Sequence, residues 1–189
     1  METRELVFHE KPDLFRPWVI AGYKGWIDAG DVSSGSVTFL RDGLGAQKFA
    51  EILSDGFHLF KDARPGVVVE GGLIRHMEFP RNEFFYWKNK PSLPDLVLFI
   101  GHEPHLRWKA FTDLFLDLAV EFQVERLVTL GGFYDQVPHT VPRKLSVVAS
   151  NDRMLADLLP HKVDLIDYAG PGGHISVLHK SAEIRGIHS

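Results

Sequence analysis

Short apolar runs that end in glycine recur along the chain and alternate with helical patterns. Residues 18–22, 95–101 and 125–131 each form such a run, which is typical of a strand buried on both faces of a parallel sheet. Between the second and third runs, residues 108–123 carry an apolar stripe at helical spacing and charged residues on the opposite face. Strand, helix and strand in this order predict a right-handed βαβ unit of a doubly wound sheet.

The segment between the first two runs mixes both periodicities. Residues 32–44 predict a helix, because apolar side chains recur there at intervals of three and four and Gly45 follows the last turn. Residues 48–53 and 57–87 are rich in Val, Ile, Phe and Tyr, and strand-like runs flank the Gly-Gly pair at 71–72 as in a hairpin. We therefore expect an antiparallel insertion, or an antiparallel edge of the sheet, in this part of the chain.

The last third of the chain continues the alternation. Residues 145–149 and 164–168 predict a fourth and a fifth strand, a helix starts near residue 151, and a last helix covers residues 174–185. An alternating pattern predicts another strand after that helix, so the domain is either shortened or lacks a C-terminal strand and helical region. With no repeat or long linker, we predict one α/β domain over residues 1–189.

Charge and composition narrow the classes of function. The chain has 21 Lys and Arg against 25 Asp and Glu, a net charge of −4, which argues against nucleic-acid binding and against a polybasic membrane anchor. The absence of cysteine excludes disulfides, thiolate metal sites and a thiol nucleophile. The longest aliphatic run, residues 96–100, is too short to span a membrane, and the charged N-terminus does not look like a signal peptide. We expect a cytoplasmic protein.

Polar residues and glycines gather in loops that directly follow the predicted strands. In open parallel sheets, ligands bind at the carboxyl ends of the strands. We therefore expect a binding site where these loops meet. The loops span residues 25–31, 101–108, 131–140 and 168–174.

In the first loop, Asp28 and Asp31 flank Gly30 just before a predicted helix. A carboxylate there binds either a ribose hydroxyl or a metal ion, or it caps the helix. Capping is the better interpretation for Asp31. Asp28 lies too early to cap, and both interpretations stay open for it.

The second loop carries His102, Glu103 and His105 within four residues. Pro104 prevents the helical geometry of a zinc motif and no third ligand is evident, so we predict no metal site. Glu103 is either a general base or a turn carboxylate paired with Arg107, and the pair is favoured.

Asp135 and His139 in the third loop form the most enzyme-like pair, because a carboxylate can fix the tautomer of an imidazole. The alternative, which we favour slightly, is a rigid turn over residues 137–143 set by its prolines. The chain has no Gly-x-Ser-x-Gly motif, so a hydrolase of that type is unsupported.

The fourth loop places glycines before the last helix, an arrangement that either exposes amides to an anion or merely makes a tight turn. Arg107 and Arg143 are candidates for a phosphate or carboxylate clamp, with a surface role as the alternative. Trp26, Phe133 and Tyr134 either wall an apolar cleft or pack in the core. No cofactor is predicted. The predicted ligand-binding residues are Trp26, Asp28, Gly30, Asp31, Glu103, Arg107, Gly131, Gly132, Arg143, Gly172, Gly173 and His174.

The order and spacing of these motifs resemble the PAC2 family, named for a proteasome assembly chaperone, from about residue 15 onward. The resemblance implies a three-layer α/β/α sandwich similar to purine nucleoside phosphorylases, with a mostly parallel sheet, and an oligomeric protein without an established reaction. The matching segments are 25–26, 28–30, 45–46, 82–84, 103–104, 106–108, 128–131, 137–140 with Arg143, 170–173 and 177–179.

The chain departs from the family pattern at a few places. Family members often have a polar residue where Ile27 stands and Asn where His105 stands, and they usually continue beyond Ser189. Archaeal relatives are thought to engage the proteasome through a C-terminal hydrophobic–tyrosine tail, and nothing similar follows Arg185. Docking by that tail is therefore not predicted for these residues.

Two functions remain from the sequence. The first, favoured by the resemblance, is an oligomeric, chaperone-like or protein-interaction module that is non-catalytic or weakly catalytic. Its interface would be an apolar patch made by Phe57, Phe60, Phe84, Phe85 and Trp87. The alternative is an enzyme or sensor for a nucleoside- or phosphate-like molecule that acts through Asp135, His139, Glu103 and Arg107.

Overall fold

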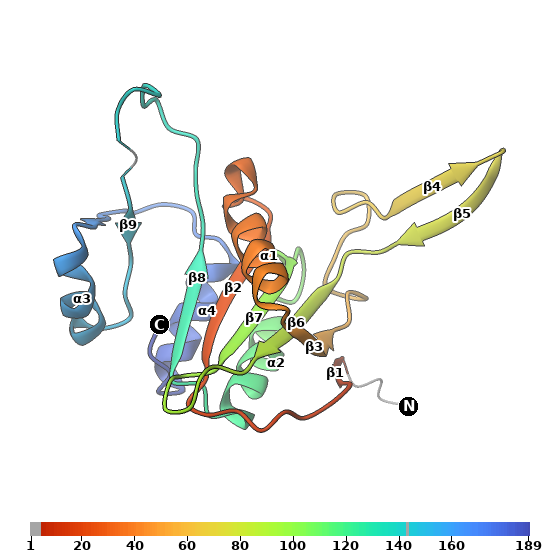
Figure 1. Ribbon diagram of the computed structural model, residues 1–189. Helices are drawn as coiled ribbons and strands as arrows, with labels where there is room; N and C mark the ends of the chain where they lie inside the picture. Colours follow the sequence, from red (N-terminus) through yellow and green to blue (C-terminus); the bar gives the residue numbers. More distant parts are fainter. Residues whose placement is uncertain (1–4, 143) are drawn as a thin grey trace.

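The protein is a mixed α/β structure built around one six-stranded sheet (Figure 1). The computed structural model describes residues 5–142 and 144–189. Its strands are β1 (Leu6–Phe8), β2 (Trp18–Lys24), β3 (Gln47–Ile52), β4 (Gly66–Glu70), β5 (Leu73–Glu78), β6 (Asn82–Trp87), β7 (Leu96–His102), β8 (Arg126–Leu130), β9 (Ser146–Val147) and β10 (Asp164–Leu165). Its helices are α1 (Val32–Leu44), α2 (Trp108–Glu121), α3 (Asp152–Leu158) and α4 (His174–Ile184), with short 3-10 turns at Ala29–Asp31 and Leu159–His161.

The order of strands in the sheet is β1-β3-β6-β7-β2-β8. Strands β7, β2 and β8 are parallel, as the three glycine-ended runs predict. The pairs β1–β3, β3–β6 and β6–β7 are antiparallel. The expectation of a mostly parallel sheet was therefore wrong, because the sheet is mixed. The segment predicted to be an antiparallel insertion or edge supplies β3 and β6, which lie with β1 on the antiparallel side of the main sheet.

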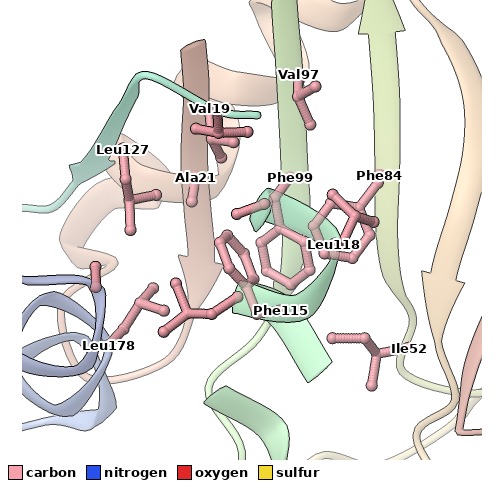
Figure 2. Close-up of a cluster of buried hydrophobic side chains, with 14 of the residues drawn as sticks. Val19, Ala21, Ile52, Phe84, Val97, Phe99, Phe115, Leu118, Leu127 and Leu178 are labelled. Atoms are coloured by element: carbon pink, nitrogen blue, oxygen red, sulfur yellow. The ribbon is translucent and has the colours of Figure 1, made fainter. Parts of the chain in front are cut away.

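Helices cover both faces of this sheet. On one face, Val37 of α1 packs with Leu98 and Phe85. The larger cluster lies on the other face, where α2 and α4 contribute Phe115 and Leu178 against the strands (Figure 2). These side chains are buried because the apolar stripe of each helix faces the sheet, as its spacing requires.

The predicted exposed patch of phenylalanines was wrong. Phe57 and Phe84 are fully buried and Phe85 is only 8% exposed. Successive residues of a strand point to opposite faces, and here both faces are covered. The ring of Phe84 packs 5.3 Å from that of Phe115 in α2, whereas Phe85 belongs to the cluster beneath α1.

The predicted fourth and fifth strands do not join the main sheet. In the structure they are the shorter strands β9 and β10, which form a separate two-stranded parallel pair. The free edge of β8 is instead contacted by the end of the chain, because the amide of Leu127 donates to the carbonyl of His188 at 2.8 Å. The apolar residues Leu145 and Val148 consequently remain 67% and 72% exposed.

The predicted hairpin is confirmed as β4 and β5, joined at Gly71 and Gly72, which adopt φ of 59° and 77°. A left-handed backbone at both turn positions favours glycine. The hairpin projects from the body and pairs with no other strand (Figure 1). Within the described residues, no helix has the length and apolar character needed to cross a membrane.

Candidate functional site

The three parallel strands end at one edge of the sheet, and hydrogen bonds join the loops that follow them. The amide of Glu103, just after β7, donates to the carbonyl of Lys24 at the end of β2 at 2.8 Å. The amide of Gly132, after β8, donates to the carbonyl of Ile27 at 2.8 Å. The loops after β2, β7 and β8 therefore form one assembled surface at the carboxyl ends of the strands, where open α/β sheets bind ligands.

Asp28 holds the start of α1. Its Oδ1 accepts from the amides of Ser33 and Ser34 at 2.8 and 2.9 Å, and its Oδ2 accepts from the Ser34 hydroxyl at 2.7 Å. The expectation that Asp31 caps this helix was wrong, since Asp31 makes no capping hydrogen bond with its side chain. The 3-10 turn, with Gly30 at φ 63°, returns the chain so that the earlier carboxylate reaches the first helical turn.

Glu103 serves the N-terminus of α4 in the same way. Its Oε1 accepts from the amide of His174 at 2.8 Å, and its Oε2 accepts from the amide of Trp26 at 3.2 Å. The favoured pair with Arg107 does not form, because Arg107 makes a bidentate ion pair with Glu5, with Nη2 at 3.1 Å from Oε2. Glu103 thus links the loop after β7 to the loop after β2 and to α4.

Close packing explains the glycines of these loops. A Cβ on Gly173 would lie 2.9 Å from Oε1 of Glu103, and one on Gly132 would lie 2.4 Å from Cγ1 of Val32. The amide of His174, the first residue of α4, already has Glu103 as an anionic partner within the chain. An external anion at the predicted glycine loop would have to displace Glu103.

His174 lies in the core. Its side chain is fully buried, its Nε2 is hydrogen-bonded to Thr112 Oγ1 at 3.0 Å, and its ring packs against Tyr23 and Phe111. Burial lowers the pKa of His174 to about 4, so the imidazole is neutral near pH 7. The imidazole therefore packs in the core at the start of α4 and does not face solvent.

Aromatic side chains stand at the surface of the same edge. A cavity of about 490 Å³ is lined by Gly25, Trp26, Asp28, Ala29, Gly30, Phe133 and Tyr134. The rings of Trp26 and Phe133 meet edge to face at 6.0 Å. Trp26, Phe133 and Tyr134 are 57%, 64% and 87% exposed, so these rings are available to a binding partner.

In the described part of the chain, the residues predicted to be catalytic are not hydrogen-bonded or ion-paired with one another. Asp135 is exposed and its Oδ1 accepts from the amide of Gln136, while His139 is exposed in the loop beyond it. Among the described residues, no hydrogen bond or ion pair joins any two of Asp135, His139, Glu103 and Arg107. The remaining predicted clamp residue, Arg143, lies outside the described residues.

Sequence reasoning missed a histidine cluster behind this edge. The ring of His58 lies 5.9 Å from that of His102 and 5.8 Å from that of His105. Asn82 connects two of them, since its Nδ2 is hydrogen-bonded to His58 and its Oδ1 accepts from the His102 amide. Burial, with a smaller effect of the His102 charge, lowers the pKa of His58 to about 4. In the sequence, the only sign of this cluster was the short spacing between His102 and His105.

These three imidazoles do not make a metal centre. Within the part of the chain that the structure describes, no group of three or more His, Cys, Asp or Glu side chains has an arrangement that could hold a metal ion. The ring nitrogen of His105 that faces the loop accepts from the amide of Leu59 at 3.2 Å. The cluster therefore packs the loop after β3 against the end of β7.

The chain is similar to a known protein family and to several solved structures. A sequence model of the PAC2 family matches residues 23–189. None of the curated proteins matches the chain significantly. A PAC2 family protein from Streptomyces avermitilis is 30% identical, with a TM-score of 0.81 over 91% of this chain and 72% of that one.

Two further solved structures are similar. A proteasome-assembly chaperone homologue from Mycobacterium tuberculosis is 28% identical, with a TM-score of 0.81 over 90% of this chain and 71% of that one. An archaeal proteasome activator from Pyrococcus furiosus is 23% identical, with a TM-score of 0.73 over 97% of this chain and 76% of that one. At that identity, the archaeal structure supports the fold alone.

Proposed function

Because this chain belongs to the PAC2 family, we propose that it is a chaperone-like protein-interaction module that forms homo-oligomers and binds a proteasome component. A structurally similar protein that is 28% identical supports the choice of partner, since it is named a proteasome-assembly chaperone homologue. The proposal assigns no catalytic reaction to the chain.

One observation carries this proposal: the carboxylates at the strand ends are bound within the chain, while the aromatic rings beside them are exposed. Asp28 and Glu103 both accept hydrogen bonds from helix N-terminal amides. A carboxylate held in this way serves structure and is poorly placed to act as a base. Exposed tryptophan and tyrosine, in contrast, are the residue types enriched at the centres of protein interfaces.

The same proposal includes the architecture. We infer one domain arranged as a three-layer α/β/α sandwich of the type found in purine nucleoside phosphorylases. Support comes from α1 on one face of the sheet and from α2 and α4 on the other. Such a scaffold is compatible with binding and with catalysis, so the fold by itself does not decide between them.

The test is binding to purified proteasome core particles and to unassembled proteasome subunits from the source organism, measured by biolayer interferometry. We expect the chain to bind one of the two, and Phe133→Ala to weaken binding by about tenfold or more. Phe39→Ala is the matched control, since Phe39 is 77% exposed on α1, away from the cavity. Equal weakening by both variants, or no binding by the wild-type chain, would contradict the proposal.

A second candidate is binding of a nucleoside- or phosphate-like small molecule, and the cavity at the strand ends favours it. Its volume of about 490 Å³ lies within the range of roughly 300–1,000 Å³ that is usual for ligand sites. A role for Asp135, His139, Glu103 and Arg107 in such a site stays a prediction. A thermal-shift screen with nucleosides, nucleotides and phosphate tests it, and only a shift lost in Tyr134→Ala but kept in Phe39→Ala would support this candidate.

A further inference from the structure

The hairpin of β4 and β5 forms an arm, residues 66–78, that no other described segment of the chain covers. Every residue of both strands is exposed. An isolated two-stranded ribbon is marginally stable in water. An arm that projects with all its side chains exposed therefore needs another surface to hold it.

One face of the arm is entirely apolar. In antiparallel pairs, residues directly opposite each other point to the same side. Val67 lies opposite Met77, and Val69 lies opposite Ile74, so these four side chains share what we call the arm face. Their exposures are 54%, 52%, 57% and 68%. Val68, Glu70, Leu73, His76 and Glu78 make the other, mixed face. Arg75 lies at a bulge between Ile74 and His76 and has no opposite residue in β4.

The distribution of charge favours a second copy of the chain as the occupant. The arm face carries no charged side chain, so nothing on it repels an identical face. The charged residues of the arm lie outside this face, with Glu70 beside the tip, Arg75 at the bulge in β5, and Arg64 and Glu78 at the base. Glu78 is paired with Arg81 at 3.4 Å. If two arms packed side by side in the same direction, Glu70 would meet Glu70. If they packed in opposite directions, Glu70 would meet Arg64 of the other copy.

The base of the arm also offers room for the tip of another. A cavity of about 410 Å³ is lined by Lys48, Glu51, Ile52, Leu53, Ser54, Met77, Glu78, Phe79, Pro80 and Arg81. Met77 belongs both to this lining and to the arm face, so the two surfaces are continuous. A ribbon of five or six residues per strand is roughly 17–20 Å long. A partner arm lying antiparallel therefore brings its small Gly-Gly tip to this cavity.

We propose that residues 66–78 are a dimerisation arm, in which the arm faces of two copies pack against each other in opposite directions and each tip enters the base cavity of the other copy. This inference rests on the homo-oligomer of the proposed function. It does not depend on the proteasome component or on the aromatic cavity. The dimerisation arm can therefore be wrong while the proteasome partner is right, and the reverse.

The first experiment compares two neighbouring valines on opposite faces of the arm. Light scattering over a concentration series is expected to show that Val69→Glu raises the dimer dissociation constant by about a hundredfold. Val68→Glu, on the mixed face, is expected to leave it within a few-fold of wild type. Circular dichroism checks that both variants fold. An oligomer unaffected by Val69→Glu, or equally affected by both, would overturn the arm but leave the homo-oligomer.

A wild-type chain that stays monomeric at all concentrations would overturn the homo-oligomer as well. The direction of packing is tested by crosslinking, because the chain has no cysteine of its own. Under mild oxidation, a mixture of Ile74→Cys and Met77→Cys chains is expected to crosslink more than either variant alone. Faster crosslinking of either single variant with itself would contradict antiparallel packing.

Discussion

The carboxylate of Glu103 accepts a hydrogen bond from the backbone amide of His174 at 2.8 Å, and so an anion within the chain holds the N-terminus of α4. The same carboxylate accepts from the amide of Trp26. One side chain therefore positions both a helix and an aromatic residue of the cavity. The dipole of α4 adds to this attraction, because the N-terminus of a helix carries partial positive charge.

Removing this carboxylate should destabilise the protein and expose the site it fills. Glu103→Ala is expected to lower the free energy of unfolding by about 1–3 kcal/mol, since two amides lose a charged acceptor. Urea unfolding followed by fluorescence measures the loss. Sulfate should restore part of it by binding at the vacated helix N-terminus.

Sulfate stabilises most proteins through exclusion from their surfaces, so the control matters. Asp167→Ala, at an exposed position, should gain no more from sulfate than the wild-type chain gains. A Glu103→Ala variant that responds to sulfate only as the wild type does would show that the helix N-terminus does not accept an external anion.

Asp28 and Asp31 should differ sharply in their contribution to stability. Asp28→Ala removes the acceptor of two amides and a hydroxyl at the start of α1, so we expect a loss of about 0.5–2 kcal/mol. Asp31→Asn keeps a residue type that tolerates the left-handed φ of 56° found there and should stay within about 0.5 kcal/mol of wild type. Chemical unfolding of both variants decides this, and the reverse ranking would refute the assignment of the cap to Asp28.

The regular elements of the central sheet could be predicted because their signals are local. The apolar runs that became β2, β7 and β8 and the striped segment that became α2 each show their pattern within one window of sequence. That β9 and β10 form a pair of their own outside the main sheet could not be predicted in this way. Contact of the β8 edge with His188 depends on a residue 61 positions after Leu127.

The location of the candidate site could be predicted from the sequence, but the hydrogen bonds and ion pairs within it could not. The loops after the parallel strands do meet, because the carboxyl ends of parallel strands lie at one edge. Which carboxylate caps α1 depends on the left-handed turn at Gly30. Similarly, Arg107 finds Glu5 rather than Glu103, and these partners lie 102 residues apart. Contacts between distant segments are fixed by tertiary packing, which one sequence does not reveal.

Buried histidines should make the protein less stable in mild acid. Burial lowers the pKa of His174 and of His179 to about 4, whereas histidine in an unfolded chain has a pKa of about 6.5. Between these values the unfolded chain binds more protons than the folded one, so stability falls as the pH drops from about 6.5 to about 4. Each fully neutral histidine contributes a slope on the order of 1 kcal/mol per pH unit.

Urea unfolding at a series of pH values between 7.5 and 4.5 measures this slope. His179→Gln should flatten it, because Gln does not titrate and can still bond to Thr129, which lies 2.8 Å from His179 Nε2. His161→Gln, at the surface, should leave the slope as it is in the wild-type chain. A profile that is flat in the wild-type protein, or that is unchanged by His179→Gln, would mean that burial does not shift this group.

Two glycines near α1 should respond in opposite ways to the same substitution. At Gly22 in β2, an added Cβ would lie 2.5 Å from the carbonyl oxygen of Ser33 and 2.8 Å from Cγ2 of Val37. Relief requires α1 to move away from the sheet, so we expect Gly22→Ala to lower the free energy of unfolding by about 1–3 kcal/mol or more. At Gly43 in α1, nothing lies within 4 Å of the added atom, and Gly43→Ala should raise that free energy by about 0.5–1 kcal/mol through helix propensity.

Because α1 begins beside Asp28 at the strand ends, Gly22→Ala should also disturb the aromatic cavity and weaken binding there, which Gly43→Ala should not. A Gly22→Ala variant as stable as the wild-type protein would show that α1 does not pack directly on β2.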